Sequence, residues 1–173
     1  MNKYIIIITF IITLTLWSCD STTTEPDAIQ MTVEQLAETP GYTWMYELLT
    51  TYQPDSIVEK NIGALLDTNR DKFIIFARAA CSCPTEKKEF AQLIKILRDL
   101  HYPTKFYEVY AMSSKTNPNP YSNIITLKDI PAVIYMRNGV PYYSIIDTLY
   151  NNVAKGLKYP VRLEDVLYEA LKN

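Results

Sequence analysis

Residues 72–77, KFIIFA, form a short apolar run that is rich in isoleucine and phenylalanine. Such a run is typical of a β-strand buried on both faces, as in a parallel sheet. A helix pattern follows it, and a second strand pattern alternates over residues 104–112. The helix carries an apolar stripe at Phe90, Leu93, Ile94, Leu97 and Leu100. Because two strands joined by a helix usually run parallel, these elements predict an α/β domain.

The residues before this unit have helical patterns. Thr32 and Gln35 have the spacing of a capping box, which predicts a short helix that ends before Pro40-Gly41. Helical spacing of apolar residues continues over residues 42–53, and Asp55 or Ser56 can cap a further helix. We therefore expect an N-terminal helical extension to the domain.

The residues after it predict a hairpin and a last helix. Two strand patterns lie within residues 130–146, and the Asn-Gly pair at 138–139 between them favours a tight turn. An amphipathic pattern over residues 160–173 closes the chain. Together these elements predict a mixed four-stranded central sheet with flanking helices on both faces.

The N-terminus has the pattern of an export signal. Lys3 precedes an apolar run from Tyr4 to Trp17, which is shorter than the ~20 apolar residues of a membrane-spanning helix. Leu16-Trp17-Ser18-Cys19 resembles the lipobox of bacterial lipoproteins. The resemblance implies cleavage before Cys19 and a diacylglyceryl group on its sulfur, whereas the alternative is an uncleaved anchor.

These features predict three regions. Residues 1–18 are expected to be a lipoprotein signal peptide, residues 19–40 a lipid-anchored tether, and residues 41–173 the folded domain. Residues 20–32 are polar and rich in threonine, as is usual for a linker. We expect the protein to lie in the cell envelope, held to the membrane through Cys19 and facing the periplasm or the exterior.

Cys81 and Cys83 are separated by one residue and lie between the first strand pattern and its helix. Pro84 and Glu86 are typical of the first turn of a helix, so the sequence predicts the helix cap at Cys83. A thiol at a helix N-terminus is stabilised as the thiolate, which is the nucleophilic form. By themselves the residues leave three alternatives: a redox pair, a metal site, or a static pair.

The order of elements resembles the thioredoxin-like family over residues 55–173. FIIFARAAC leads from a strand to the first cysteine, DIPAVIYMRNGVPYY is similar to the family's cis-proline segment, and RLEDVLYEALKN corresponds to its last helix. The resemblance implies thiol–disulfide exchange with protein substrates. It makes Cys81 the attacking thiol and Cys83 the resolving thiol. It also implies that Pro131 is cis and that Ile130 contacts the substrate backbone.

Three positions depart from the family pattern. The pair is Cys-x-Cys rather than Cys-x-x-Cys, Ala80 stands where a tryptophan is common, and Ile75 replaces a buried acid. The smaller disulfide ring is expected to be strained and more oxidising, which favours disulfide donation or isomerisation.

The alternatives are a non-catalytic binding lipoprotein with a static disulfide and, less favoured, a Cu(I) site on the two thiolates. The one histidine, His101, is placed by the helix pattern at the far end of the helix from the cysteines. No cofactor and no metal are expected. A net charge of −2 without a basic stripe gives no reason to expect a nucleic-acid partner.

Overall fold

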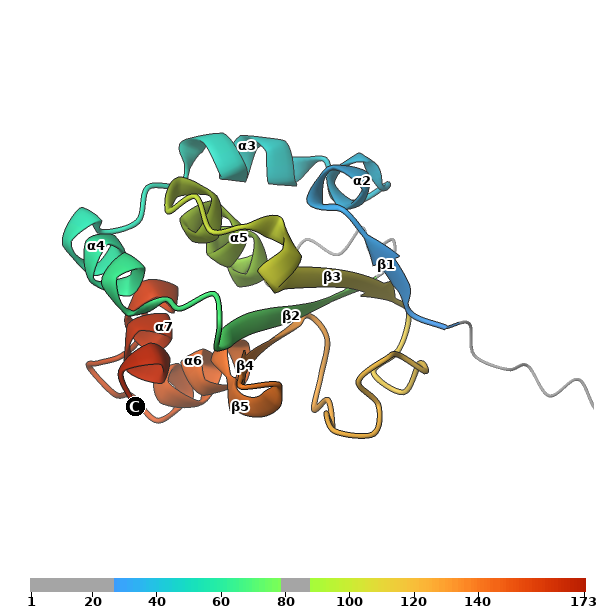
Figure 1. Cartoon of the computed structure of the whole chain (residues 1–173). Coiled ribbons are helices and arrows are strands. Elements are labelled where there is room, and N and C mark those ends of the chain that lie inside the picture. The colour runs from blue at the N-terminus through green and yellow to red at the C-terminus, as the bar shows by residue number, and fades with distance from the viewer. Residues whose placement is uncertain (1–26, 79–87) are drawn as a thin grey trace, which may run out of the picture.

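Five strands form one mixed sheet in the computed structural model, which describes residues 27–78 and 88–173 (Figure 1). The strands are β1 (Ile29–Met31), β2 (Asp71–Arg78), β3 (Tyr107–Met112), β4 (Ala132–Arg137) and β5 (Val140–Ser144). Their order across the sheet is β1-β3-β2-β4-β5. As predicted, β2 and β3 are parallel, and the other neighbouring pairs are antiparallel.

The prediction of four strands was wrong, because β1 adds a fifth. This strand comes from the segment that the sequence analysis assigned to the tether, and Ile29 pairs with Ala111 of β3. Three residues are too few to show an alternating pattern, and Ile29 is exposed. The open edge of β3, rather than the local sequence, determines that these residues form a strand.

Six helices and one 3₁₀ turn accompany the sheet in the described residues. They are α2 (Val33–Glu38), α3 (Trp44–Thr51), α4 (Ser56–Leu65), α5 (Glu89–Asp99), η1 (Thr104–Phe106), α6 (Ile145–Ala154) and α7 (Leu163–Lys172). The capping box of α2 is confirmed, since the Gln35 N–H donates to Thr32 Oγ1 at 3.1 Å and the Thr32 N–H donates to Gln35 Oε1 at 2.8 Å. Helix α6, which follows β5 directly, was not predicted from the sequence.

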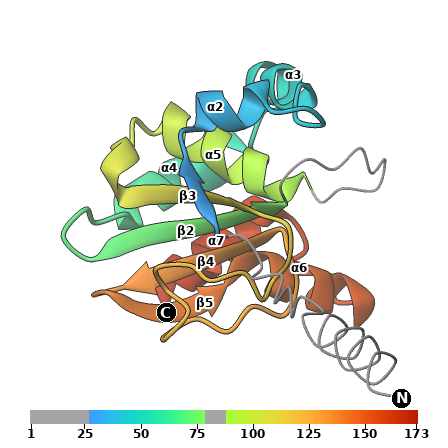
Figure 2. The same cartoon turned by 90° about the vertical axis from the view of Figure 1, so that its right-hand side faces the viewer.

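The two faces of the sheet are covered differently. Phe73, Ile75 and Ala77 of β2 face a large core that includes buried residues of each of the six helices. Ile74 and Phe76 face a smaller core to which the described helices contribute no buried residue. Among the described residues, the helices therefore cover one face, whereas we expected helices on both faces. The chain between β3 and β4 covers the face of the sheet that carries the smaller core. In Figure 2 this connection lies in front of the strands and α7 lies behind them.

This covering connection, residues 113–131, is long for a segment without regular structure. Ile125, Tyr121 and Leu127 pack from it onto the smaller core. Asn117 is 1% exposed, and its side-chain oxygen accepts hydrogen bonds from the Ser114 N–H and the Ser113 hydroxyl. These contacts shape the connection as a layer on the sheet.

The hairpin agrees with the sequence prediction. Asn138 and Gly139 both have positive φ, at 53° and 77°, as a tight two-residue hairpin turn requires. Within the described residues, no helix is long and apolar enough to cross a membrane.

Candidate functional site

Three strand ends meet at one edge of the sheet. Arg78 at the end of β2 pairs in register with Met112 at the end of β3. On the other side, Phe76 pairs with Ala132 at the start of β4. The polypeptide therefore leaves β2 toward the cysteine pair beside the segment that enters β4. This is the edge at which ligands bind in many sheets with parallel strands.

The predicted residues Cys81, Cys83 and Cys19 lie outside the described residues. What can be described is how the chain enters and leaves the cysteine segment. Cys81 is three residues beyond Arg78. Consecutive Cα atoms are about 3.8 Å apart, so connectivity limits the separation of the Cys81 and Arg78 Cα atoms to about 11 Å.

Ile130 and Pro131 lie beside this exit from β2. The peptide bond between them is cis, as the resemblance implied. The pairing of β2 with β4 ends at Phe76 and Ala132, so Pro131 and Ile130 directly precede the paired part of β4, near the end of β2. Both residues are buried, and the Ile130 N–H donates to its neighbour Asp129 at 2.9 Å. A substrate backbone would have to displace that bond or use the Ile130 carbonyl.

The predicted start of the helix after the cysteines differs from the start of α5. This helix begins at Glu89, and its N-cap residue is Lys88. Cys83 is therefore not the N-cap of α5, because that helix begins six residues later. The effect of a helix dipole on the Cys83 thiol stays a prediction, because Cys83 lies outside the described residues.

Tyr42 holds the end of β2. Its ring is fully buried and packs edge-on against Phe90 of α5, with ring centroids 6.1 Å apart. Its hydroxyl donates a hydrogen bond to the carbonyl oxygen of Arg78. Tyr42 therefore links the last residue of β2 to the first turn of α5, on either side of the cysteine segment.

Two further contacts hold the start of α5, where the chain returns from the cysteine segment. The Lys88 ammonium lies 5.0 Å from the centre of the Trp44 ring. The Tyr150 hydroxyl, from α6, donates to Glu89 Oε1 at 2.7 Å. Burial and this carboxylate raise the pKa of Tyr150. The sequence predicted only a helix over residues 42–53, because no local signal links residue 44 to residue 88.

Replacing Tyr42 with phenylalanine is expected to lower the free energy of unfolding by about 1–2 kcal/mol, because the Arg78 carbonyl loses a buried donor. Urea unfolding measures this change. Tyr46→Phe is the matched control, since Tyr46 is 49% exposed, and it should change stability by less than about 0.5 kcal/mol. Equal effects of the two substitutions would contradict this role of Tyr42.

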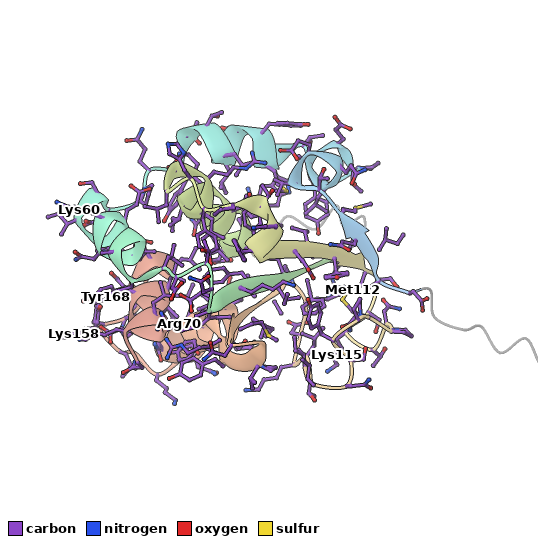
Figure 3. The ribbon with its side chains drawn as sticks, in the orientation of Figure 1. Lys60, Arg70, Met112, Lys115, Lys158 and Tyr168 are labelled. Atoms are coloured by element: carbon purple, nitrogen blue, oxygen red, sulfur yellow. The ribbon has the colours of Figure 1, made fainter. Side chains whose placement is uncertain are left out.

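A buried charge network lies at the other end of β2, where Arg70 and Met112 mark opposite ends of the sheet (Figure 3). The Asp71 carboxylate is 1% exposed and accepts from the Tyr135 hydroxyl at 2.6 Å, from Arg70 Nε at 2.8 Å and from the Asp67 N–H at 2.9 Å. Burial raises the pKa of Asp71, but these hydrogen bonds outweigh it and the net shift is downward.

The same network raises the pKa of Tyr135 to about 12, through burial and the hydrogen bond to Asp71. Arg137 donates to the Tyr135 hydroxyl at 3.0 Å and to the Leu171 carbonyl at the end of α7 at 3.0 Å. The cluster is thus saturated by internal contacts. We interpret it as an anchor between β2, β4 and α7 rather than a reactive site.

A cavity of about 520 Å³ lies between the β1–α2 segment and the start of β3. Arg98, Lys105 and Tyr107 are among its lining residues. Because Tyr107 pairs with Phe73 near the start of β2, this cavity is not at the edge where Arg78 leads to the cysteines.

His101 has a positive φ of 53° and follows the C-terminal end of α5, as the sequence predicted. Within residues 27–78 and 88–173, no group of three His, Cys, Asp or Glu side chains could hold a metal ion.

Comparison with known proteins finds no matching family model, no matching curated protein and no matching solved structure.

Proposed function

We propose that this protein is a lipid-anchored thioredoxin-like protein of the cell envelope that exchanges disulfides through Cys81 and Cys83. The observation that carries the proposal is the meeting of three strand ends. The chain leaves β2 toward Cys81 near the Ile130–Pro131 segment that directly precedes β4. A reactive pair at this edge would have a backbone segment beside it for a substrate to contact.

The proposed fold is supported by the order and direction of the helices and strands. The α/β architecture, the parallel β2–β3 pair, the β4–β5 hairpin and the C-terminal helix α7 are compatible with a thioredoxin-like domain. The fifth strand and the covering connection of residues 113–131 are departures of this chain from the four-stranded arrangement that we expected.

In the oxidising direction, a substrate thiolate attacks the Cys81 sulfur of the Cys81–Cys83 disulfide and releases the Cys83 thiolate. A second substrate thiolate then attacks the substrate sulfur of the mixed disulfide and releases Cys81. The substrate loses two electrons and gains a disulfide, while the cysteine pair gains the two electrons. A small-molecule or protein disulfide must then reoxidise the pair.

A binding module with a static disulfide is the second candidate. The burial of Ile130 and Pro131, together with the bond from the Ile130 N–H to Asp129, favours it, because the groups that would meet a substrate are already engaged. A disulfide across so short a loop would add little stability, which favours the redox function. The Cu(I) alternative gains no support from His101, which lies beyond the far end of α5.

The test is a thiol titration of the full chain in detergent. Alkylation of each cysteine is followed by mass spectrometry across a pH series, and the pair is equilibrated with glutathione. We expect a Cys81 pKa below the ordinary thiol value of about 8.5. We also expect the reduction potential of the pair to lie well above that of thioredoxin, a strong reductant, at about −270 mV.

Two results would contradict the proposed disulfide exchange, and a third would contradict only its expected direction. Unreactive thiols under native conditions would indicate the static module. Protection of both thiols by Cu(I) at stoichiometric concentration would indicate metal binding. A potential close to that of thioredoxin would keep redox activity but reverse the expected direction.

A further inference from the structure

Exposed apolar side chains are concentrated at the C-terminal end of α6 and in the connection from α6 to α7. Ten large apolar residues are notably exposed in the described chain, and four of them lie within residues 150–159. They are Tyr150, Val153, Leu157 and Tyr159, at 37%, 54%, 47% and 52% exposure. Single exposed apolar residues are ordinary, but such a concentration in one short segment is typical of a contact surface.

The segment is held in a defined shape. At the end of α6, the Gly156 N–H donates to the Val153 carbonyl and the Leu157 N–H donates to the Asn152 carbonyl, with Gly156 at a φ of 68°. This is the Schellman pattern, in which an apolar residue at the position of Leu157 often packs back onto its helix. Here Leu157 stays half exposed, so the cap presents its side chain to the surroundings.

Further on, the Asn152 side chain donates to the Pro160 carbonyl at 2.9 Å, and the Tyr159 hydroxyl donates to Glu169 at 3.0 Å. These bonds tie both ends of the connection to α6 and α7. The apolar side chains are therefore presented by a braced turn rather than by a free loop.

Along the chain the charged residues of this segment are lysines, whereas in space two carboxylates meet its tyrosines, Glu169 at Tyr159 and Glu89 at Tyr150. Lys155 and Lys158 are exposed and alternate with the apolar residues, and the chain has no acidic residue between Asp147 and Glu164. Figure 3 shows Lys158 at the outer edge of the molecule. Exposed apolar and aromatic side chains among lysines suit the boundary between lipid headgroups and acyl chains, where the apolar groups insert and the lysines meet anionic headgroups.

We propose that residues 153–159 bind the surface of a membrane that contains anionic lipid. A second copy of the chain fits this surface less well. A symmetric contact would place the same patch on both partners, so Lys155 and Lys158 would face their own copies. An anionic lipid surface neutralises both lysines and also accepts the apolar side chains.

One consequence rests on the proposed anchor at Cys19. Strand β1 lies at one side of the domain, and the connection that joins α6 to α7 lies at the opposite side (Figure 1). With the anchor attached before β1, a second contact at residues 153–159 holds the domain along the membrane instead of letting it rotate on its tether. The lipid contact itself depends on neither the anchor nor the redox activity.

The test places a tryptophan in the segment. The full chain with Leu157→Trp is reconstituted in phosphatidylcholine vesicles, with or without phosphatidylglycerol, and brominated acyl chains serve as the quencher. The signal of the parent protein is subtracted, because Trp44 also fluoresces, as does Trp17 in any chain that keeps residues 1–18. We expect the added fluorescence to shift to the blue and to be quenched several-fold more strongly in the anionic vesicles.

Tyr46→Trp on α3 is the matched control, because Tyr46 is also about half exposed but lies on another part of the surface. It should be quenched weakly and equally in both vesicles. The pair of substitutions Lys155→Glu and Lys158→Glu, made together in the Leu157→Trp chain, should remove the additional quenching, and added salt should weaken it.

The proposal is overturned if Leu157→Trp behaves like the Tyr46→Trp control in anionic vesicles, or if the two lipids quench it equally. A blue shift that appears without vesicles and grows with protein concentration would overturn it in favour of a second copy. Hydrogen exchange of residues 150–162 in the unsubstituted chain repeats the comparison without any substitution. Faster exchange in phosphatidylcholine alone than in anionic vesicles supports the proposal, and equal exchange contradicts it.

Discussion

Replacing Asp71 with asparagine is expected to lower the free energy of unfolding by about 3 kcal/mol, the largest stability effect that we predict for a single polar group. The carboxylate is almost fully buried and accepts from Arg70, Tyr135 and the backbone N–H of Asp67. An amide in its place presents two hydrogens to groups that are themselves donors. Urea unfolding of the parent and variant measures the difference.

The effect should depend on pH in a defined direction. Because the pKa of Asp71 is lowered in the folded protein, its charge contributes stability above the unfolded value of about 3.9. That contribution disappears as the pH falls through the folded pKa. The parent and Asp71→Asn should therefore differ most near neutral pH and converge below about pH 4.

Asp99→Asn is the matched control. Asp99 forms an ion pair with Lys95 one turn earlier on α5, and it lies at the surface. Exposed pairs of this kind contribute roughly 0.3–0.5 kcal/mol, so this variant should differ little from the parent. If Asp71→Asn were as stable as Asp99→Asn at neutral pH, the network would not be the anchor that we describe.

The second large effect concerns the cysteines, and it rests on the proposed function. Cys83→Ser is expected to trap a mixed disulfide between Cys81 and a substrate protein, because the thiol that resolves it is gone. Cys81→Ser should trap nothing and should lower the rate of disulfide exchange on the order of 100-fold or more, since a serine hydroxyl does not replace the thiolate. Non-reducing electrophoresis of solubilised membranes separates the trapped species.

The comparison of the two variants carries its own control. Trapping by Cys81→Ser instead of Cys83→Ser would exchange the two roles without removing the activity. If neither variant trapped a substrate and both kept the parent's exchange rate with glutathione, the pair would not be redox active, and the binding module would be the better interpretation. Cys19 remains unchanged in both variants, so the proposed anchor is not altered.

Elements with a strong local signal were predicted correctly. The apolar run of β2, the stripe of α5 and the Asn138-Gly139 turn each depend on a few neighbouring residues. The capping residues Thr32 and Asp55 are also local, since their side chains bond to amides within three residues. Such signals survive in a sequence because the interacting groups are close along the chain.

Predictions failed mainly where contacts with residues distant in sequence determine the local structure. Ile29–Met31 is a strand because β3 offers it an open edge. The miss of α6 is different, because Ile145, Ile146 and Leu149 have helical spacing that the sequence already contains. The start of α5 at Glu89 also differs from the local signal of Pro84 and Glu86. Patterns of three to six residues do not contain these contacts.

The sequence by itself determined the parallel strand pair, the hairpin, the closing helix and the order in which the cysteines and Pro131 occur along the chain. Only the tertiary structure decided that the Ile130–Pro131 segment lies beside the end of β2, that Tyr42 holds the Arg78 carbonyl, and that a connection rather than a helix covers the second face of the sheet. The physical reason is the distance along the chain between the residues that interact. Propensity and capping act between near neighbours, whereas register, burial and hydrogen bonds across 36 residues exist only after the chain has folded.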